Sequence, residues 1–170
     1  MGKKIAVIVT DMFEDSEYTK PVEAFRDKGH TVINVGLTAG KVVIGKSQGT
    51  KVTIDKAVAD VSINDFDALL IPGGYSPDKL RVNEKAVQFT ADFVTSNKPV
   101  LAICHAGQLL ITAKVLKGRT FTGYISIVQD IKNAGADYVD REVVVDGNLV
   151  SSRTPDDIPA FIEESLKILA

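Results

Sequence analysis

The segment of residues 98–111 changes its hydrophobic period in the middle, and this change constrains the fold more than any other feature. Residues 100–103 form an apolar run with the length and composition of a buried strand. Apolar residues at helical spacing follow through Ala113. The change falls at Cys104, where small neighbours suit a tight strand-to-helix turn. The segment therefore predicts a β-α unit with a thiol at its corner.

The same succession of strand and helix patterns recurs along the chain. Residues 4–9 and 66–71 are apolar throughout, as expected of parallel strands that are covered on both faces. Residues 16–28 and 83–96 show the spacing of amphipathic helices. This alternation predicts an α/β fold, a flavodoxin-like three-layer sandwich around a mostly parallel sheet. No linker interrupts it, so we expect a single domain over residues 1–170.

Two shorter features complete the predicted fold. Residues 42–44 and 51–54 indicate a small antiparallel excursion, because glycines separate two short apolar runs. Residues 143–150 predict a hairpin, since the pair Asp146-Gly147 is a strong turn signal.

Composition excludes several classes of function. The chain has 20 basic and 22 acidic residues and no long charge run, so we expect neither nucleic acid nor a membrane as partner. Its one cysteine excludes an internal disulfide and a metal site built from several thiolates, and we expect no cofactor. The first apolar run is short for a signal peptide, which together with a free thiol predicts a cytoplasmic protein.

Three predicted strand ends carry polar residues or glycines. Acidic residues occupy positions 11–15, the pair Gly73-Gly74 leads to Asp78, and Cys104 is followed by a histidine. In open α/β sheets, ligand sites form outside the carboxyl ends of the strands. Loops from neighbouring strands could therefore bring these three segments into one site.

Cys104 has two interpretations. Most free cysteines are small buried apolar residues. At a strand-to-helix turn we favour a reactive thiol, because helix N-termini lower thiol pKa values. His105 is the one imidazole that could assist, since His30 falls in a helix-to-strand turn away from the strand ends. The backbone N–H of His105 also faces the position of an oxyanion.

The other candidate residues are also open to a structural interpretation. Glu14, Asp15 and Glu17 could be solvated loop carboxylates, but a carboxyl beside a thiolate would have a raised pKa and could move protons. Asp78 fits a helix start equally well. Gly74 could supply a second oxyanion donor, although glycine pairs serve many turns.

Four segments, in this order along the chain, together resemble the DJ-1/PfpI superfamily. They are FEDSE at 13–17, IPGG at 71–74, AICH at 102–105 and VSSRTPDD at 150–157. Within the superfamily the chain most resembles the PfpI-like branch, often described as intracellular proteases or general stress proteins. The resemblance covers essentially the whole chain and implies the flavodoxin-like fold.

The resemblance also implies roles for residues. Cys104 matches the nucleophile, Glu14 matches the acidic residue that contacts the thiol, and the backbone N–H groups of Gly74 and His105 match the oxyanion donors. In PfpI-like members a glutamate reaches the histidine across a subunit interface, and Asp78 stands at that position, one methylene shorter. Ala-Gly follows His105 where the family usually has Gly-Pro. Both departures count against a protease-type triad and leave the pair of Cys104 and Glu14 untouched.

Members of the superfamily have been credited with peptidase, deglycase and cofactor-free glyoxalase activities and with oxidative-stress sensing. The leading hypothesis is therefore a stress-protective hydrolase or lyase whose Cys104 adds to the carbonyl of a 2-oxoaldehyde, a glycation adduct or a peptide. The alternative is a non-enzymatic sensor whose Cys104 oxidises to sulfinate. A class I glutamine amidotransferase needs a histidine far downstream of its cysteine, which this chain lacks after His105. The resemblance further implies a homo-oligomer, either a dimer or a hexamer.

Overall fold

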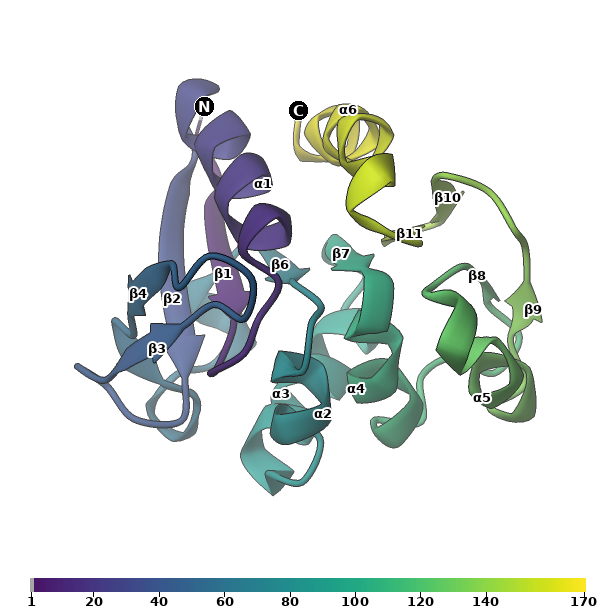
Figure 1. Cartoon of the computed structure of the whole chain (residues 1–170), viewed down its shortest axis with the longest axis horizontal. Helices are drawn as coiled ribbons and strands as arrows, with labels where there is room; N and C mark the ends of the chain where they lie inside the picture. Colours follow the sequence, from purple (N-terminus) through teal and green to yellow (C-terminus); the bar gives the residue numbers. More distant parts are fainter. Residues whose placement is uncertain (1) are drawn as a thin grey trace.

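A seven-stranded sheet forms the middle layer of the fold, which the computed structural model describes for residues 2–170. Its strands are β1 (Lys4–Ile8), β2 (Thr31–Gly36), β5 (Lys56–Ala57), β6 (Ala68–Ile71), β7 (Val100–Ile103), β10 (Val144–Asp146) and β11 (Leu149–Ser152). They lie in the order β10-β11-β7-β6-β1-β2-β5 (Figure 1). Neighbouring strands are parallel except β10 and β11, which form the predicted hairpin.

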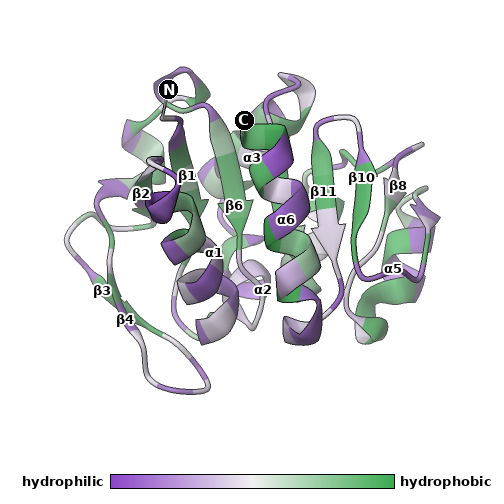
Figure 2. Cartoon of the chain, turned by 90° about the horizontal axis from the view of Figure 1, so that it is seen from above, coloured by the Kyte–Doolittle hydropathy of each residue, from purple (hydrophilic) through white to green (hydrophobic). Residues whose placement is uncertain are grey.

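Helices cover both faces of this sheet. One face carries α1 (Asp15–Asp27) and α6 (Ile158–Leu169), and the other carries α2 (Ser76–Leu80), α3 (Glu84–Thr95) and α4 (Gly107–Thr112). The outward sides of α1 and α6 are largely hydrophilic, whereas the strands beneath them are hydrophobic (Figure 2). The structure thus confirms the predicted three-layer α/β architecture.

The two cores follow from the alternation of side chains along each strand. In β1, Ile5 and Val7 pack in the core beneath α1 and α6, whereas Ala6 and Ile8 pack in the core beneath α3 and α4. Because both faces are buried, the central strands have no polar side, and this is why they appear as continuous apolar runs.

Smaller elements lie at the two ends of the sheet. The predicted antiparallel excursion is present as β3 (Val42–Ile44) and β4 (Lys51–Thr53). At the other end, α5 (Val128–Asn133) lies beside a parallel pair, β8 (Thr120–Phe121) and β9 (Asp137–Tyr138). Single 3₁₀ turns occupy Val58–Asp60, Ile63–Asp65, Cys104–Ala106, Ile125–Ile127 and Pro155–Asp157. Across residues 2–170 no helix is both long and apolar enough to cross a membrane.

Candidate active site

The loops that follow β1, β6 and β7 meet at one edge of the sheet, as predicted from the three polar strand ends. These strands are neighbours, in the order β7-β6-β1. Phe13 and Gly74 form an antiparallel bridge between two of the loops, and the N–H of Tyr75 donates to the carbonyl of Met12 at 2.8 Å. Together the loops enclose a cavity of about 430 Å³, lined by Glu14, Glu17, Lys46, Gly74, Tyr75, Cys104, His105, Tyr124 and Pro155.

Cys104 occupies the corner between β7 and the helical segment, as predicted. Its φ angle is +64°, in the left-handed region that non-glycine residues rarely adopt, and its side chain is nearly buried at 7% exposure. Such a conformation costs about 1–3 kcal/mol and persists where the surroundings enforce it. Here the N–H of Tyr124 donates to the carbonyl of Cys104 at 3.0 Å. The strained corner places the thiol in the cavity.

The carboxyl group beside this thiol belongs to Glu17, not to Glu14 as expected. The Glu17 side chain is fully buried and lies beside Cys104 in the cavity lining. Its Oε1 accepts the N–H of Gly73 at 2.9 Å. Its Oε2 is buried without a hydrogen-bond partner in residues 2–170. A buried oxygen with no N–H or O–H donor favours the protonated carboxyl.

Helix geometry explains why Glu17 takes this place. Glu14 is the extended residue just before α1, and it points to the cavity mouth, where its Oε2 lies 3.2 Å from Nζ of Lys46 and accepts the Ser47 hydroxyl at 3.1 Å. Glu17 lies in the first turn of the helix, on the same side as the buried Pro21 and Phe25. The sequence signal that could have identified Glu17 is its position on the same side of the helix as the apolar residues that become buried.

The thiol and the carboxyl group affect each other's protonation. Burial is the main cause that raises the pKa of Glu17, to about 8, and the charge of Glu14 adds to it. Glu17 therefore carries a proton at neutral pH. Burial also raises the pKa of Cys104, as does a charge on Glu17, whereas the backbone N–H groups of His105 and Gly74 oppose this rise.

The lowered thiol pKa expected from a helix N-terminus is thus not what the structure gives. The helix α4 begins only at Gly107 and has six residues, so burial outweighs its effect on the sulfur. Protonation of Glu17 removes the negative charge that opposes a thiolate. Because the carboxyl also lies beside the sulfur, its proton can stabilise a thiolate.

His105 lies beside the thiol, and a hydrogen bond to Ser126 orients the opposite side of its ring. Its Nδ1 is 3.4 Å from Sγ of Cys104, and its Nε2 is 3.2 Å from the hydroxyl of Ser126. Its ring packs on Tyr124 with centroids 4.7 Å apart. Burial is the main cause that lowers the pKa of His105, so the imidazole is neutral at pH 7.

Asp78 lies apart from this arrangement within one chain. Its side chain is 60% exposed on α2, with its carboxylate 4.0 Å from the guanidinium of Arg81 in the next turn. In the single chain, the hydrogen-bonding partner at Nε2 of His105 is Ser126 instead. The expected contact of Asp78 with the histidine across a subunit interface stays a prediction.

The backbone N–H groups of Gly74 and His105 act on the Cys104 sulfur. Both oppose the rise of the pKa of this thiol. Gly74 has a φ angle of +77°, and its place between two loops leaves no room for a side chain: an added Cβ would lie 2.6 Å from the Met12 carbonyl oxygen. This geometry allows the two donors to face a reacting atom bound to sulfur.

Lys46, on the loop between β3 and β4, is a site residue that was not predicted. The loop is tied to the start of α1 because Asp15 accepts the N–H of Ser47 at 2.8 Å and that of Thr50 at 2.9 Å. Although burial alone would raise the pKa of Asp15, hydrogen bonds from Thr50 and Ser47 lower it to about 2. The ionised Asp15 thereby holds Lys46 over the cavity. No local pattern marks this contact, since it depends on tertiary packing.

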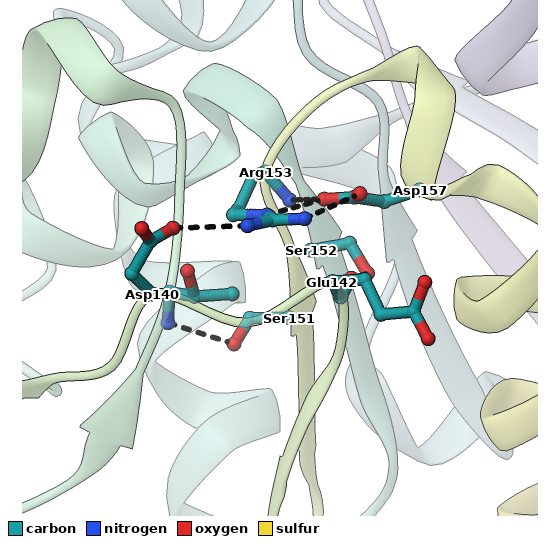
Figure 3. A network of polar contacts seen from close by, with 7 residues as sticks. Asp140, Glu142, Ser151, Ser152, Arg153 and Asp157 are labelled. Carbon is teal, nitrogen blue, oxygen red and sulfur yellow. Dashed lines mark hydrogen bonds and ion pairs between the residues drawn. The ribbon is translucent and has the colours of Figure 1, made fainter.

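Pro155 was also not predicted as a lining residue, and a polar network fixes the loop that carries it. Figure 3 shows Arg153 between two carboxylates. Its Nε and Nη2 donate to the two oxygens of Asp157 at 2.9 and 3.0 Å, and its Nη1 donates to Asp140 at 3.0 Å. Beside it, the hydroxyl of Ser152 donates to the carbonyl of Glu142 at 2.6 Å. The network joins the end of β11 to α6 and supports the cavity wall.

Comparison with known proteins adds relatives of the whole chain. Residues 3–168 match the model of the DJ-1/PfpI family. General stress protein 18 of Bacillus subtilis is 59% identical over 170 residues, which cover 99% of this chain and 99% of that protein. Protein/nucleic acid deglycase 2 of Escherichia coli is 56% identical over 170 residues, with 99% of each chain covered.

Solved structures share the fold. The two-domain protein of Anabaena variabilis, which contains DJ-1/ThiJ/PfpI-like and ferritin-like domains, is 37% identical with a TM-score of 0.95. The match covers 97% of this chain and 47% of that one, so the chain spans about half of that protein. DJ-1beta of Drosophila melanogaster is 27% identical with a TM-score of 0.91, and the match covers 100% of this chain and 91% of that one.

Proposed function

The chain belongs to the DJ-1/PfpI family, and on this basis we propose that it is a stress-protective enzyme whose Cys104 adds to reactive carbonyl compounds. Its substrates would be 2-oxoaldehydes and the adducts that these form with amines, in line with the relative named as a deglycase. One observation carries the proposal: the buried carboxyl of Glu17, with its pKa raised to about 8, lies beside the only thiol of the sequence. This pair combines a nucleophile with a proton donor.

The first step would form a bond between sulfur and the aldehyde carbon. The thiol gives its proton to the neutral imidazole of His105, whose Nδ1 lies 3.4 Å from the sulfur. The electron pair of the C=O bond moves to oxygen, which takes the proton from Glu17 and becomes the hydroxyl of a hemithioacetal. The backbone N–H groups of Gly74 and His105 would stabilise the developing oxyanion. Glu17 is left as a carboxylate, which is a base.

The second step would use that base. Glu17 removes the hydrogen from the carbon bonded to sulfur, which gives an enediol, and a proton returned to the neighbouring carbon produces a 2-hydroxyacyl thioester. Water then hydrolyses the thioester and releases a 2-hydroxy acid and the free thiol. One carbon is oxidised and its neighbour reduced, so the sequence consumes only water.

Peptide hydrolysis is less well supported by the site. A protease-type triad needs a carboxylate at the far nitrogen of the histidine. In the single chain, Nε2 of His105 is hydrogen-bonded to the hydroxyl of Ser126. The exposed carboxylate of Asp78 pairs with Arg81 instead.

The proposal is tested by following formation of the 2-hydroxy acid from methylglyoxal. We expect Cys104→Ser to abolish turnover. Full turnover of methylglyoxal by Cys104→Ser would refute the proposal, and a peptide substrate in the same assay separates the carbonyl activity from a protease activity.

A redox sensor is the second candidate, and the donors around sulfur favour it. A Cys104 sulfinate could accept hydrogen bonds from the N–H groups of Gly74 and His105 and from protonated Glu17. Two equivalents of peroxide would each transfer one oxygen atom to sulfur and leave as water. Intact mass after mild peroxide treatment tests this, and a protein that gains no oxygen at Cys104 is not such a sensor.

We also propose that copies of the chain associate into a dimer or hexamer in the cytoplasm. Val82 and Ile125 are large apolar side chains that are 85% and 78% exposed, and an interface between copies would remove such side chains from water. Light scattering in solution would measure the assembly, and a monomer at all concentrations would contradict it.

A further inference from the structure

We propose that Lys46, with Glu14 as its partner, makes the mouth of the cavity a binding site for a carboxylate, so that the preferred substrates are oxoaldehydes that carry a carboxylate at their other end. This inference rests on the proposed function, because it names the substrate class of the same site. It concerns a cation that the proposed reaction does not use.

Lys46 reaches the cavity from outside the catalytic loops. Its Nζ lies 3.2 Å from Oε2 of Glu14 and 5.6 Å from the centre of the Tyr75 ring, and all three residues line the cavity. Its side chain is 32% exposed, so the ammonium group can meet a ligand that enters from solvent. An ammonium group has three N–H donors, and Glu14 is the ion-pair partner of one.

The position of Lys46 is fixed from two sides. Its backbone N–H donates to the carbonyl of Phe13 at 2.9 Å, which ties it to the loop after β1. The next residue, Ser47, is held by the ionised carboxylate of Asp15. A preorganised cation loses less freedom when a ligand binds than a flexible surface lysine does.

Among the residues that line the cavity, Lys46 is the group that carries a positive charge at neutral pH. Burial keeps His105 neutral, and the charge of Lys46 further lowers the pKa of that imidazole. Glu17 is protonated at neutral pH. The negative charge of Glu14 compensates Lys46 in the free protein and raises its pKa. A substrate carboxylate would thus share Lys46 with Glu14, while the aldehyde end reaches Cys104.

A matched pair of substrates tests the inference. The compound 4,5-dioxopentanoate has an aldehyde at one end and a carboxylate at the other, and its methyl ester lacks the charge. A charge-assisted hydrogen bond is worth about 1.5–3 kcal/mol, which corresponds to roughly 10–100-fold in binding. We expect Lys46→Met to lower the ratio of kcat/KM for the acid to kcat/KM for the ester by this factor, and Lys46→Arg to restore most of it.

Two more variants sharpen the test. Glu14→Gln removes the competing carboxylate and should raise the same ratio. Lys41→Met is the matched control, since Lys41 forms a similar ion pair at 3.2 Å, with Asp11, but does not line the cavity. The inference is overturned if Lys46→Met and Lys41→Met give the same ratio as the wild type.

A binding measurement separates this inference from the proposed function. Levulinate has the carboxylate and a ketone but no aldehyde, and calorimetry can follow its binding without turnover. Binding that Lys46→Met weakens at least about tenfold supports the carboxylate site even where no oxoaldehyde is converted. Equal binding of levulinate by the two proteins overturns it, even where turnover of methylglyoxal confirms the proposed function.

Discussion

Glu17 and Cys104 meet against the backbone of Gly73. A Cβ atom added to Gly73 would lie 2.6 Å from Oε1 of Glu17 and 2.8 Å from Cβ of Cys104. The N–H of the same glycine donates to Glu17. One residue of the loop after β6 thus lies against both the acid of α1 and the thiol-bearing residue that follows β7.

Gly73→Ala should therefore separate the pair. The added methyl group must displace a buried carboxyl or the strained Cys104, and overpacking of this kind costs about 1–3 kcal/mol. We expect lower stability in urea and a large loss of turnover. Gly118→Ala is the control, because its added Cβ meets no atom within 4 Å. Its positive φ should cost stability while turnover is kept, and equal turnover by both variants would contradict the contact.

The stability of the protein should fall with rising pH through Glu17. Burial raises its pKa from an ordinary 4.5 to about 8, so between these values the folded state binds more protons than the unfolded state. The stabilisation present below pH 4.5 is then lost as pH rises toward 8. Urea unfolding of the wild type and Glu17→Gln across this range should show a decline that the variant lacks. If the free energy of unfolding depends on pH in the same way in both proteins, Glu17 does not titrate as described.

Ser126→Ala should weaken the orientation of His105. The hydroxyl of Ser126 is 3.2 Å from Nε2, and a hydrogen bond of this type is worth about 1 kcal/mol, or roughly fivefold in rate. We expect a loss of turnover of this size and a shift in the pH profile, while thermal stability changes little. A variant with an unaltered pH profile would show that Ser126 does not orient the imidazole.

Arg153→Met should destabilise the fold more than it affects the chemistry. It leaves Asp157, whose side chain is only 5% exposed, without its bidentate partner. Because Arg153 itself is partly exposed, we expect a loss of about 2 kcal/mol in urea unfolding. Combining it with Asp157→Asn should recover part of the loss, since no buried charge then remains unpaired. No recovery would mean that the lost stability has another cause.

The sequence was sufficient for the fold and for the position of the thiol. The hydrophobic periods of strands and helices, two and 3.6 residues, can be read from a short stretch of sequence. Parallel strands also place their carboxyl ends at the same edge of a sheet. For this reason the elbow at Cys104 and the neighbouring Gly74 could be predicted.

The acid and the cation of the site depend on longer-range geometry. The choice between Glu14 and Glu17 is set by the residue at which α1 begins, because only residues inside the helix share its buried side. Lys46 reaches the cavity through hydrogen bonds between Asp15 and a distant loop, which leave no periodic signal in the sequence.

The central claim is that Glu17 and Cys104 act as one pair, and rates of 2-hydroxy acid formation from methylglyoxal test it most directly. General acid–base catalysis contributes about 10²–10⁴-fold. We therefore predict that Glu17→Gln lowers kcat/KM at least about 100-fold, whereas Glu14→Gln lowers it less than about tenfold. A Glu17→Gln enzyme that keeps its activity, beside a Glu14→Gln enzyme that loses it, would contradict the account.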